Sequence, residues 1–306
     1  MERVIRELIA DQAVTDVLVN GDGSVWVDRG RHLERSSLTL PDAPSVRRLA
    51  VRLAASAQRR LDDAMPYADG QLPHGVRLHA VLAPIATDGA HISLRVPRRT
   101  AWTLAELQGN GSVSQSQASA LRDLVARRRS ILVTGGTGTG KTTLLAALLA
   151  QIPHEERVVV VEDVSELLVP HPHVVRLQAR HRNVEGAGEV TMTDLVRQAM
   201  RMRPDRLVVG EVRGAEVIDL FRAFNTGHEG GFATVHANSA HDAMTRLEAL
   251  GSLAGLPGAA VRTQAIAAID AVVHLERVDG VRRVGEIVPW PPTRRRQQVT
   301  VEEVPP

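Results

Sequence analysis

The glycine-rich segment Gly135–Gly140, followed by Lys141 and Thr142, constrains this chain more than any other stretch. The apolar run Ile131–Val133 precedes it and predicts a buried strand, while an Ala/Leu-rich stretch follows it and predicts a helix. This order of strand, loop and helix is the context that the pattern G-x-x-x-x-G-K-[ST] requires. The segment is therefore predicted to be a phosphate-binding loop rather than an ordinary glycine-rich turn.

Each residue type in this segment suits a bound triphosphate. Glycines let the backbone turn tightly and bring its N–H groups close to an anion, and a helix N-terminus adds about half a positive charge. Lys141 supplies a point charge for the β- and γ-phosphates, and the Thr142 hydroxyl suits Mg²⁺. We therefore predict ATP and Mg²⁺ as ligands. The predicted binding residues are Gly135, Gly136, Thr137, Gly138, Thr139, Gly140, Lys141, Thr142 and Thr143.

Composition limits the remaining classes of function. A length of 306 residues suggests about two domains, whose cores must be built from Ala, Leu, Val and Ile because only 2% of the residues are aromatic. The absence of cysteine excludes disulfides, four-cysteine zinc sites and thiol catalysis, and it fits a reducing cytosol. The net charge of +2 argues weakly against a dedicated nucleic-acid binder, which usually has a concentrated basic face.

Hydropathy predicts a protein without its own membrane anchor. No run of about 18 apolar residues is present, so no transmembrane helix is expected. The first residues, MERVIRELIADQAV, include acidic side chains and lack the apolar centre of a signal peptide. We therefore expect a cytoplasmic protein that reaches a membrane only through a partner.

Local patterns predict two domains and a connecting segment. Residues 1–98 are predicted to form a small α+β domain of hairpins and two helices, with a turn at Asn20–Gly23 between two strands. The Gly, Ser, Asn and Gln content of residues 99–112 predicts a linker. Residues 113–290 are predicted to form the second domain, and residues 291–306 a disordered tail.

Chemically active side chains follow three predicted strands of the second domain. Glu162 ends a run of four valines, Glu211 follows Leu207–Val209, and His236 follows Phe232–Val235. Strands that alternate with helices predict a parallel, doubly wound sheet, whose carboxyl edge holds the ligand. A strand-end acid by itself is often an ordinary surface carboxylate. Next to a phosphate loop, either glutamate can accept a proton from the attacking water or organise Mg²⁺, and His236 can contact the γ-phosphate.

Four sequence blocks together resemble the type II/IV secretion-system ATPase superfamily. They are GGTGTGKTT (135–143), VVVVEDVSEL (158–167), RMRPDRLVVGEVRGAE (201–216) and NTGHEGGFATVHANSA (225–240). The last three are similar to the family's Asp box, atypical Walker B box and His box. The stretches VTDVLVNGDGSVWVDRG, RLHAVLAP and HISLRV are similar to the branch that drives Tad/Flp-type (tight adherence) pili.

The resemblance implies a RecA-like core, a homo-hexamer and ATP hydrolysis at the cytoplasmic face of an inner-membrane machine, with a platform protein as partner. It implies that Glu162 and Glu211 organise metal and water, and leaves open which of them is the general base. It also implies that Arg203 and Arg213 transmit the nucleotide state and that Arg95, from the first domain, is offered to the nucleotide. Two alternatives remain: a DNA-translocating ATPase of conjugal transfer, and a nucleotide-gated scaffold with little turnover.

Overall fold

The computed structural model divides into two compact units, Met1–Thr100 and Ala101–Pro306, and each is described here by itself. No helix among the described residues is long and apolar enough to cross a bilayer. The described residues are 2–11, 13–30, 32–97, 100–180, 182, 187–227, 229–278 and 280–291.

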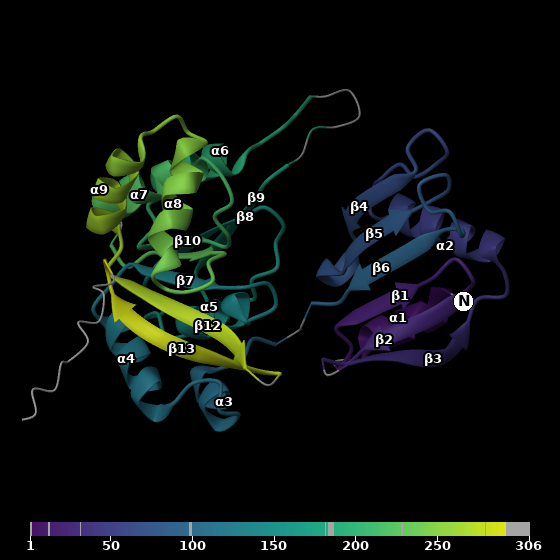
Figure 1. Cartoon of the computed structure of the whole chain (residues 1–306), viewed down its shortest axis with the longest axis horizontal. Helices are drawn as coiled ribbons and strands as arrows, with labels where there is room; N and C mark the ends of the chain where they lie inside the picture. The colour runs from purple at the N-terminus through teal and green to yellow at the C-terminus, as the bar shows by residue number, and fades with distance from the viewer. Residues whose placement is uncertain are drawn as a thin grey trace, which may run out of the picture. The chain divides into compact units, whose positions relative to one another are not determined.

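The first unit is an antiparallel six-stranded sheet with two α-helices, in the strand order β3-β2-β1-β6-β5-β4 (Figure 1). Helix α2 begins with Asp42, whose side chain accepts a hydrogen bond from the Ser45 N–H, and it packs on β4, β5 and β6. The elements are α1 (Glu2–Ala10), β1 (Asp16–Val19), β2 (Ser24–Asp28), β3 (Leu33–Thr39), α2 (Ala43–Ser56), β4 (Tyr67–Gln71), the 3₁₀ turn η1 (Pro73–Gly75), β5 (Arg77–Val81) and β6 (His91–Arg95).

The first unit has the predicted α+β character, and the predicted turn at Asn20–Gly23 does join β1 to β2. A Cβ on Gly21 would lie 2.2 Å from the Asp88 carbonyl oxygen, so this turn requires glycine. Strands β3 and β4 were not predicted. The alternation of β3 is weak, because its residues are exposed or half-buried at the sheet edge.

The second unit is a seven-stranded sheet with helices on both faces, in the order β13-β12-β7-β11-β10-β8-β9. Its elements are α3 (Leu104–Gly109), α4 (Gln115–Ala126), β7 (Ile131–Gly135), α5 (Lys141–Leu149), β8 (Val158–Glu162), β9 (Val174–Gln178), α6 (Met192–Ala199), the 3₁₀ turn η2 (Met200–Met202), β10 (Arg206–Val209), α7 (Glu216–Asn225), β11 (Phe232–Val235), α8 (Asp242–Ser252), α9 (Gly258–Ala268), β12 (Ala271–Val278) and β13 (Val281–Pro289).

The pairing confirms the predicted doubly wound α/β core. All pairs in this sheet are parallel except β12 with β13, which form an antiparallel hairpin at one edge. Every residue of β7, β8, β10 and β11 is buried, as expected for strands covered on both faces. Ile131 and Val133 pack with α3, α4 and α5, and Leu132 packs with the layer of α6 to α9.

The predicted linker, residues 99–112, differs from the observed division. Residues 101–112 belong to the second unit, and α3 begins with a full capping box in which the Thr103 side chain accepts from the Glu106 N–H. Leu104 and Leu107 are buried in the core that surrounds α5. The Gly- and Asn-rich segment therefore forms the turn between α3 and α4. Arg98 and Arg99 lie outside the described residues, as does the predicted tail from residue 292 onward.

Candidate active site

The predicted phosphate loop connects β7 to α5 in a conformation that needs its glycines. Gly135, Gly138 and Gly140 have φ values of +147°, +73° and +97°. A Cβ on Gly135 would lie 2.5 Å from the Leu275 carbonyl oxygen, so no other residue fits without displacing backbone. Inside the loop, the Thr139 hydroxyl donates to the Gly136 carbonyl at 2.9 Å.

The open side of the loop carries backbone groups suited to an anion. Gly136, Thr137 and Gly138 are exposed, and α5 begins after Gly140 without a side-chain cap on its first amides. Uncapped amides and the helix dipole together favour a bound phosphate. Thr142 is exposed and Thr143 half-buried on the first turn of α5.

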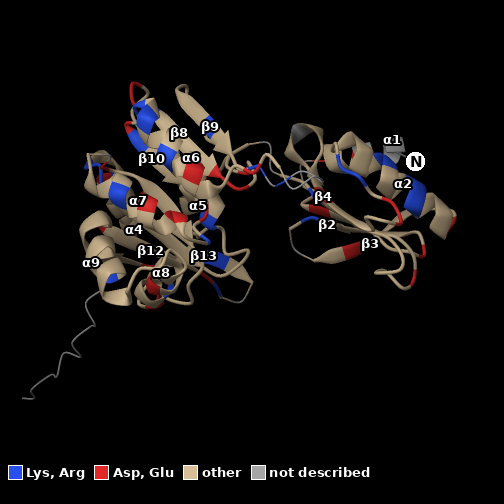
Figure 2. Ribbon diagram, turned by 90° about the horizontal axis from the view of Figure 1, so that it is seen from above, with Lys and Arg blue, Asp and Glu red and all other residues tan. Residues whose placement is uncertain are grey.

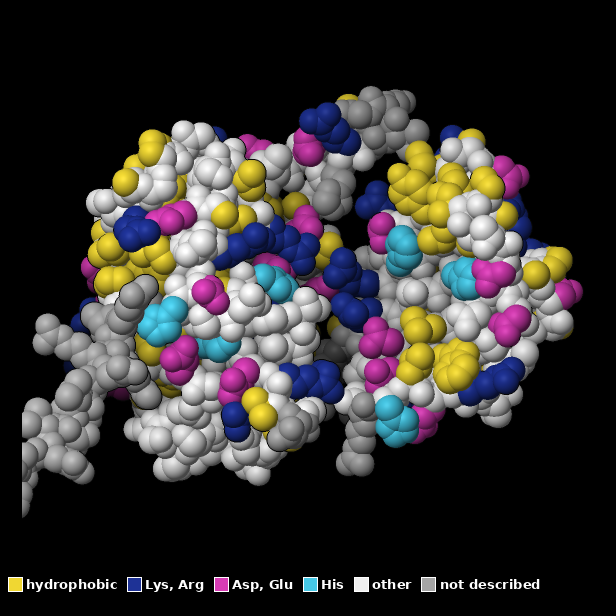
Figure 3. Space-filling model, in the orientation of Figure 1, with side chains coloured by type: hydrophobic (Ala, Val, Ile, Leu, Met, Phe, Trp, Pro, Cys, Tyr) yellow, Lys and Arg dark blue, Asp and Glu magenta, His cyan; other side chains and the backbone are white. Residues whose placement is uncertain are grey.

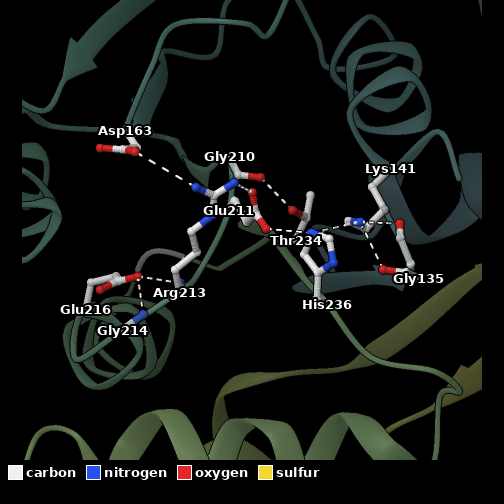
Figure 4. A network of polar contacts seen from close by, with 11 residues as sticks. Gly135, Lys141, Asp163, Gly210, Glu211, Arg213, Gly214, Glu216, Thr234 and His236 are labelled. Carbon is white, nitrogen blue, oxygen red and sulfur yellow. Dashed lines mark hydrogen bonds and ion pairs between the residues drawn. The ribbon is translucent and has the colours of Figure 1, made fainter. Parts of the chain in front are cut away.

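Lys141 is buried against the loop that it follows. Its Nζ donates to the carbonyl oxygens of Gly135 at 2.9 Å and Gly136 at 2.7 Å (Figure 4). Burial lowers the pKa of Lys141, because the ammonium has lost most of its contact with water. It is also the only lysine in the 306 residues, where basic side chains are otherwise arginine.

A row of ionisable side chains leads away from Lys141 along the carboxyl edge of the sheet (Figure 4). His236 Nε2 lies 3.4 Å from Lys141 Nζ and 2.7 Å from Glu211 Oε1. Glu211 Oε2 accepts from Arg213 Nη2 at 2.5 Å, and Arg213 Nη1 lies 4.0 Å from Asp163 Oδ2. The row crosses from β11, beside the loop strand, to β10 and then to the end of β8.

The protonation of this row follows from what each group can donate. An ionised carboxylate only accepts, so the short contact with Glu211 places the imidazole proton on His236 Nε2. The pKa of His236 is lowered mainly by burial and secondly by the nearby Lys141 charge, which favours the neutral imidazole. The Lys141 ammonium and His236 Nε2–H, 3.4 Å apart, are then both donors and do not bond to each other. The Lys141 ammonium donates to the two glycine carbonyls instead.

The Glu211–Arg213 pair contributes little to stability. The Arg213 side chain is 62% exposed and that of Glu211 is 24% exposed, so water screens their attraction. Such pairs typically contribute about 0–1 kcal/mol to the free energy of unfolding. The hydrogen bond to Glu211 raises the pKa of Arg213. The effect of the pair is therefore mainly to fix the orientation of the Glu211 carboxylate.

Glu162 is at the predicted edge but is not joined to this row. Its Oε1 accepts from the N–H groups of Glu166 at 3.0 Å and Leu167 at 2.8 Å, which orders the loop after β8. Within the described residues its Oε2 has no hydrogen-bond partner. A Cβ on Gly210 would lie only 2.8 Å from Glu162 Cγ, which explains the glycine before Glu211. The partnership of Glu162 with Glu211 at one metal stays a prediction.

Glu162→Gln is expected to be more stable than the wild type at high pH. Burial raises the pKa of Glu162 above its ordinary value of 4.5, so the folded chain binds this proton more tightly than the unfolded chain. The wild-type free energy of unfolding therefore falls as pH rises through the window between the ordinary and the raised pKa. Glutamine does not ionise, so the variant avoids this pH-dependent loss of stability. Its side-chain oxygen can still accept hydrogen bonds from the same two backbone N–H groups.

Thermal unfolding from about pH 4 to about pH 8 measures the difference. The gain in Tm of Glu162→Gln should be largest at the alkaline end and shrink toward the acidic end. The exposed Glu155→Gln serves as the control and should follow the wild-type curve. A Glu162→Gln protein that is less stable than the wild type at pH 8 would contradict the assignment.

Two predicted arginines are not brought to this row. Arg203 is exposed and has a left-handed backbone at φ 53° before β10, at the opposite end of that strand from Glu211. The predicted role of Arg203 in transmitting the nucleotide state stays a prediction. Arg95 belongs to the first unit, where its Nε lies 3.2 Å from Asp16 Oδ1. Its role in hydrolysis stays a prediction.

Some polar residues of the site were not predicted. Thr234 is buried and donates to the Gly210 carbonyl at 2.6 Å, which ties β11 to the residue before Glu211. Asp163 and Glu216 stand within the recognised sequence blocks, but nothing in their spacing showed that they flank Arg213. In the space-filling view, side chains of Lys and Arg, of Asp and Glu, and of His all lie on one face of the second unit (Figure 3).

A pocket opens beside the phosphate loop. It is formed within the second unit by α3, the turn after α3, the start of α5 and the β12–β13 hairpin. Its walls are mostly apolar with a few polar groups, as is usual for small-molecule sites. Residues that line it include Trp102, Asn110, Thr139, Gly140, Thr143 and Arg282.

The donor set at this edge suits Mg²⁺ only in part. Among the described residues no cluster of three or more His, Asp or Glu side chains that could hold a metal occurs. Mg²⁺ typically takes one or two protein oxygens and completes its shell with water and substrate phosphates. The exposed Thr142 hydroxyl and the Glu211 carboxylate fit that pattern. Glu162 also keeps one oxygen, Oε2, that has no hydrogen-bond partner among the described residues and is a possible ligand of this kind.

A glycine-rich phosphate loop, a buried lysine and a histidine–carboxylate pair at the carboxyl edge of a mostly parallel sheet define a P-loop nucleotide-binding unit. The family model described as "Type II/IV secretion system protein" matches residues 1–281, and the chain belongs to that family. The predicted family is thus confirmed.

Relatives with curated names cover most of the chain. A Mycobacterium tuberculosis protein whose name assigns it to conjugal transfer is 53% identical over 291 residues, which cover 93% of this chain and 83% of that protein. Conjugal transfer protein TrbB of Rhizobium radiobacter is 32% identical, over 91% of this chain and 84% of that protein. Type IV secretion system protein PtlH of Bordetella pertussis is 32% identical, over 91% of each.

Solved structures share the fold. The VirB11 ATPase of the Brucella suis type IV secretion system, in complex with sulphate, is 28% identical with a TM-score of 0.51, over 94% of this chain and 92% of that one. The pilus retraction motor PilT with bound ADP is 20% identical with a TM-score of 0.64, over 94% and 80% of the two chains. The predicted fold class is confirmed.

Proposed function

We propose that this protein hydrolyses ATP to power a type II/IV secretion machine or the assembly of a Tad/Flp-type pilus. The observation that carries the proposal is the contact row from Lys141 through His236 to Glu211, which starts at the phosphate loop. Membership of the secretion family and the ATPases among the similar structures support it.

The residues of the row have separate roles in this proposal. The Lys141 ammonium exchanges the glycine carbonyls for the β- and γ-phosphate oxygens, and the loop amides hold the remaining charge. Glu211 orients the attacking water and accepts its proton. His236, neutral at physiological pH, holds the carboxylate through Nε2–H and faces the γ-phosphate. Thr142 and Glu211 would hold Mg²⁺, which supplies further charge neutralisation when bound.

The nucleoside part of ATP is placed in the pocket beside the loop. Thr139, Gly140 and Thr143 line both the pocket and the phosphate-loop turn, so a ligand seated on the loop amides can continue into the pocket. Trp102 and the apolar walls then cover the base. Among the described residues Arg282 has no ion pair and can donate to the sugar or base.

The assembled form that we propose is a cytoplasmic homo-hexamer held at the inner membrane by a platform protein. The support is the family relationship, and the relatives named for secretion systems are components of membrane machines. Glu211 and His236 act within one chain, while Arg95 is the predicted contribution of the first unit to hydrolysis.

Conjugal DNA transport is the second candidate, favoured by the relatives named for conjugal transfer. Charge argues against direct DNA binding, because the net charge is +2 and basic and acidic positions are interspersed over both units in Figure 2. ATPase assays with and without DNA separate the two, and sizing with and without a non-hydrolysable ATP analogue tests the hexamer. Turnover that is indifferent to DNA supports the secretion motor, and strong stimulation by DNA supports the translocase.

A further inference from the structure

The turn after Glu211 is held by a buried carboxylate from the helix that follows. Glu216 is the first residue of α7 and is 6% exposed. Its Oε1 accepts from the Arg213 N–H at 2.6 Å and from the Gly214 N–H at 2.8 Å. A Cβ on Gly214 would lie 3.0 Å from Glu216 Oε2, so the carboxylate lies flat against this turn.

These two bonds fix the backbone from which the Arg213 side chain leaves. The Arg213 guanidinium then reaches Glu211 at 2.5 Å on one side and approaches Asp163 at 4.0 Å on the other (Figure 4). No Lys or Arg forms an ion pair with Glu216 among the described residues. Its charge is instead offset by the two amides and by the positive end of α7.

The contact to Arg213 has the geometry of the carboxylate half of a capping box, because Glu216 accepts from the N–H three residues earlier, as Asp194 accepts from Thr191. The usual cap is a short Ser, Thr, Asp or Asn side chain at the residue before the helix, and here that residue is Ala215 without a side-chain hydrogen bond. Glu216 reaches back past Ala215 to the N–H groups of Arg213 and Gly214, in the turn that follows Glu211. Its bonds are thus made to the turn that aims Arg213.

We propose that Glu216 is a positioning residue for ATP hydrolysis: its carboxylate fixes the Arg213–Gly214 turn, and Arg213 in turn holds the Glu211 carboxylate in its orientation. The inference rests on the proposed function. Loss of Glu216 leaves the phosphate loop intact, so it should slow the chemical step without weakening nucleotide binding.

A double-mutant cycle with Arg213 tests this route of action. Glu216→Ala should lower kcat about tenfold and change KM by less than about twofold. In the Arg213→Ala background the same substitution should have no further effect on kcat, because the group that it positions is gone. A Glu216→Ala loss that persists in full in that background would overturn the proposal.

The conservative variant separates positioning from charge. Glu216→Gln keeps an oxygen that accepts both amides, so it should retain most of the wild-type kcat. A Glu216→Gln protein as slow as Glu216→Ala would contradict the role of these bonds. Asp194→Ala is the matched control, because Asp194 likewise accepts from a backbone N–H, that of Thr191 at the start of α6, and it has no hydrogen bond or ion pair with the row among the described residues. It should lose stability but keep kcat.

Amide exchange provides a readout that needs no turnover. By mass spectrometry, exchange in the peptide covering residues 210–217 should rise in Glu216→Ala and stay at the wild-type level in Glu216→Gln. Unchanged exchange in Glu216→Ala would refute the positioning of the turn even if ATP is hydrolysed. A wild type without ATPase activity but with the expected exchange pattern would instead defeat the proposed function alone.

Discussion

Lys141→Ala should reduce ATP turnover by at least about 10³-fold and remove most nucleotide binding. Removing one group that stabilises the charge of the transition state typically lowers the rate by about 10²–10³-fold. Lys141 also neutralises phosphate charge in the bound substrate. Within the contact row, Lys141 is the only side chain that joins the loop to His236. The measurement is phosphate release under saturating ATP and Mg²⁺, with binding followed by titration of a fluorescent ATP analogue.

The control for this variant removes a positive charge elsewhere. Arg129→Ala breaks an exposed pair with Asp270, 3.0 Å away, before the amino end of the loop strand. It should leave turnover within about twofold, because surface pairs contribute little. Both proteins should be folded by circular dichroism, since among the described residues the Lys141 ammonium contacts only loop carbonyls and His236. Normal turnover in Lys141→Ala would defeat the assignment of the phosphate site.

Glu211→Gln should bind ATP normally and lower kcat by about 10²–10⁴-fold, the usual contribution of a positioned general base. Glutamine preserves the shape of the side chain and an oxygen for Arg213, but it cannot accept a proton from water. The expected signature is a large fall in kcat with little change in KM. Rapid-quench measurement of a single turnover identifies the affected step as the chemical one.

Glu248→Gln is a closely matched control. Glu248 of α8 is 23% exposed, compared with 24% for Glu211, and it forms a 2.7 Å pair with Arg262 of α9. It should retain wild-type turnover. Turnover by Glu211→Gln within about twofold of the wild type would remove Glu211 as the base. Weak wild-type hydrolysis that is also indifferent to this change would favour the nucleotide-gated scaffold.

The core of the second unit was predictable because local and long-range signals agree there. The buried valine run before Glu162 and the apolar run before Gly135 can only be strands covered on both faces. Each is followed by polar or glycine residues, which places these residues at the carboxyl edge of the sheet. The spacing of Thr191 and Asp194 likewise indicates a capping box, and the structure has one there. In contrast, the glycine-rich stretch near residue 110 fits both a linker and a tight turn, and only the burial of Leu104 and Leu107 distinguishes them.

Lateral position within the sheet could not be predicted in the same way. Sequence places Glu162, Glu211 and His236 at one edge, but strand order decides their distance from the loop strand. Strands β11, β10 and β8 follow β7 in that order, at about 4.8 Å per strand, so Glu162 is farthest away. The side-chain hydrogen bonds of Glu162 and Glu216 to loop amides depend on backbone geometry that residue spacing does not reveal.

The most direct test of the account is labelling with an ATP analogue that carries an acyl group on its terminal phosphate. A lysine amine beside that phosphate attacks the acyl carbon, and the nucleotide leaves as its phosphate. Because Lys141 is the only lysine in these 306 residues, peptide mass spectrometry reads the result without ambiguity. We predict acylation of Lys141 that excess ATP prevents. A Lys141 that stays unmodified, or is modified equally with and without ATP, would contradict a triphosphate site at this loop.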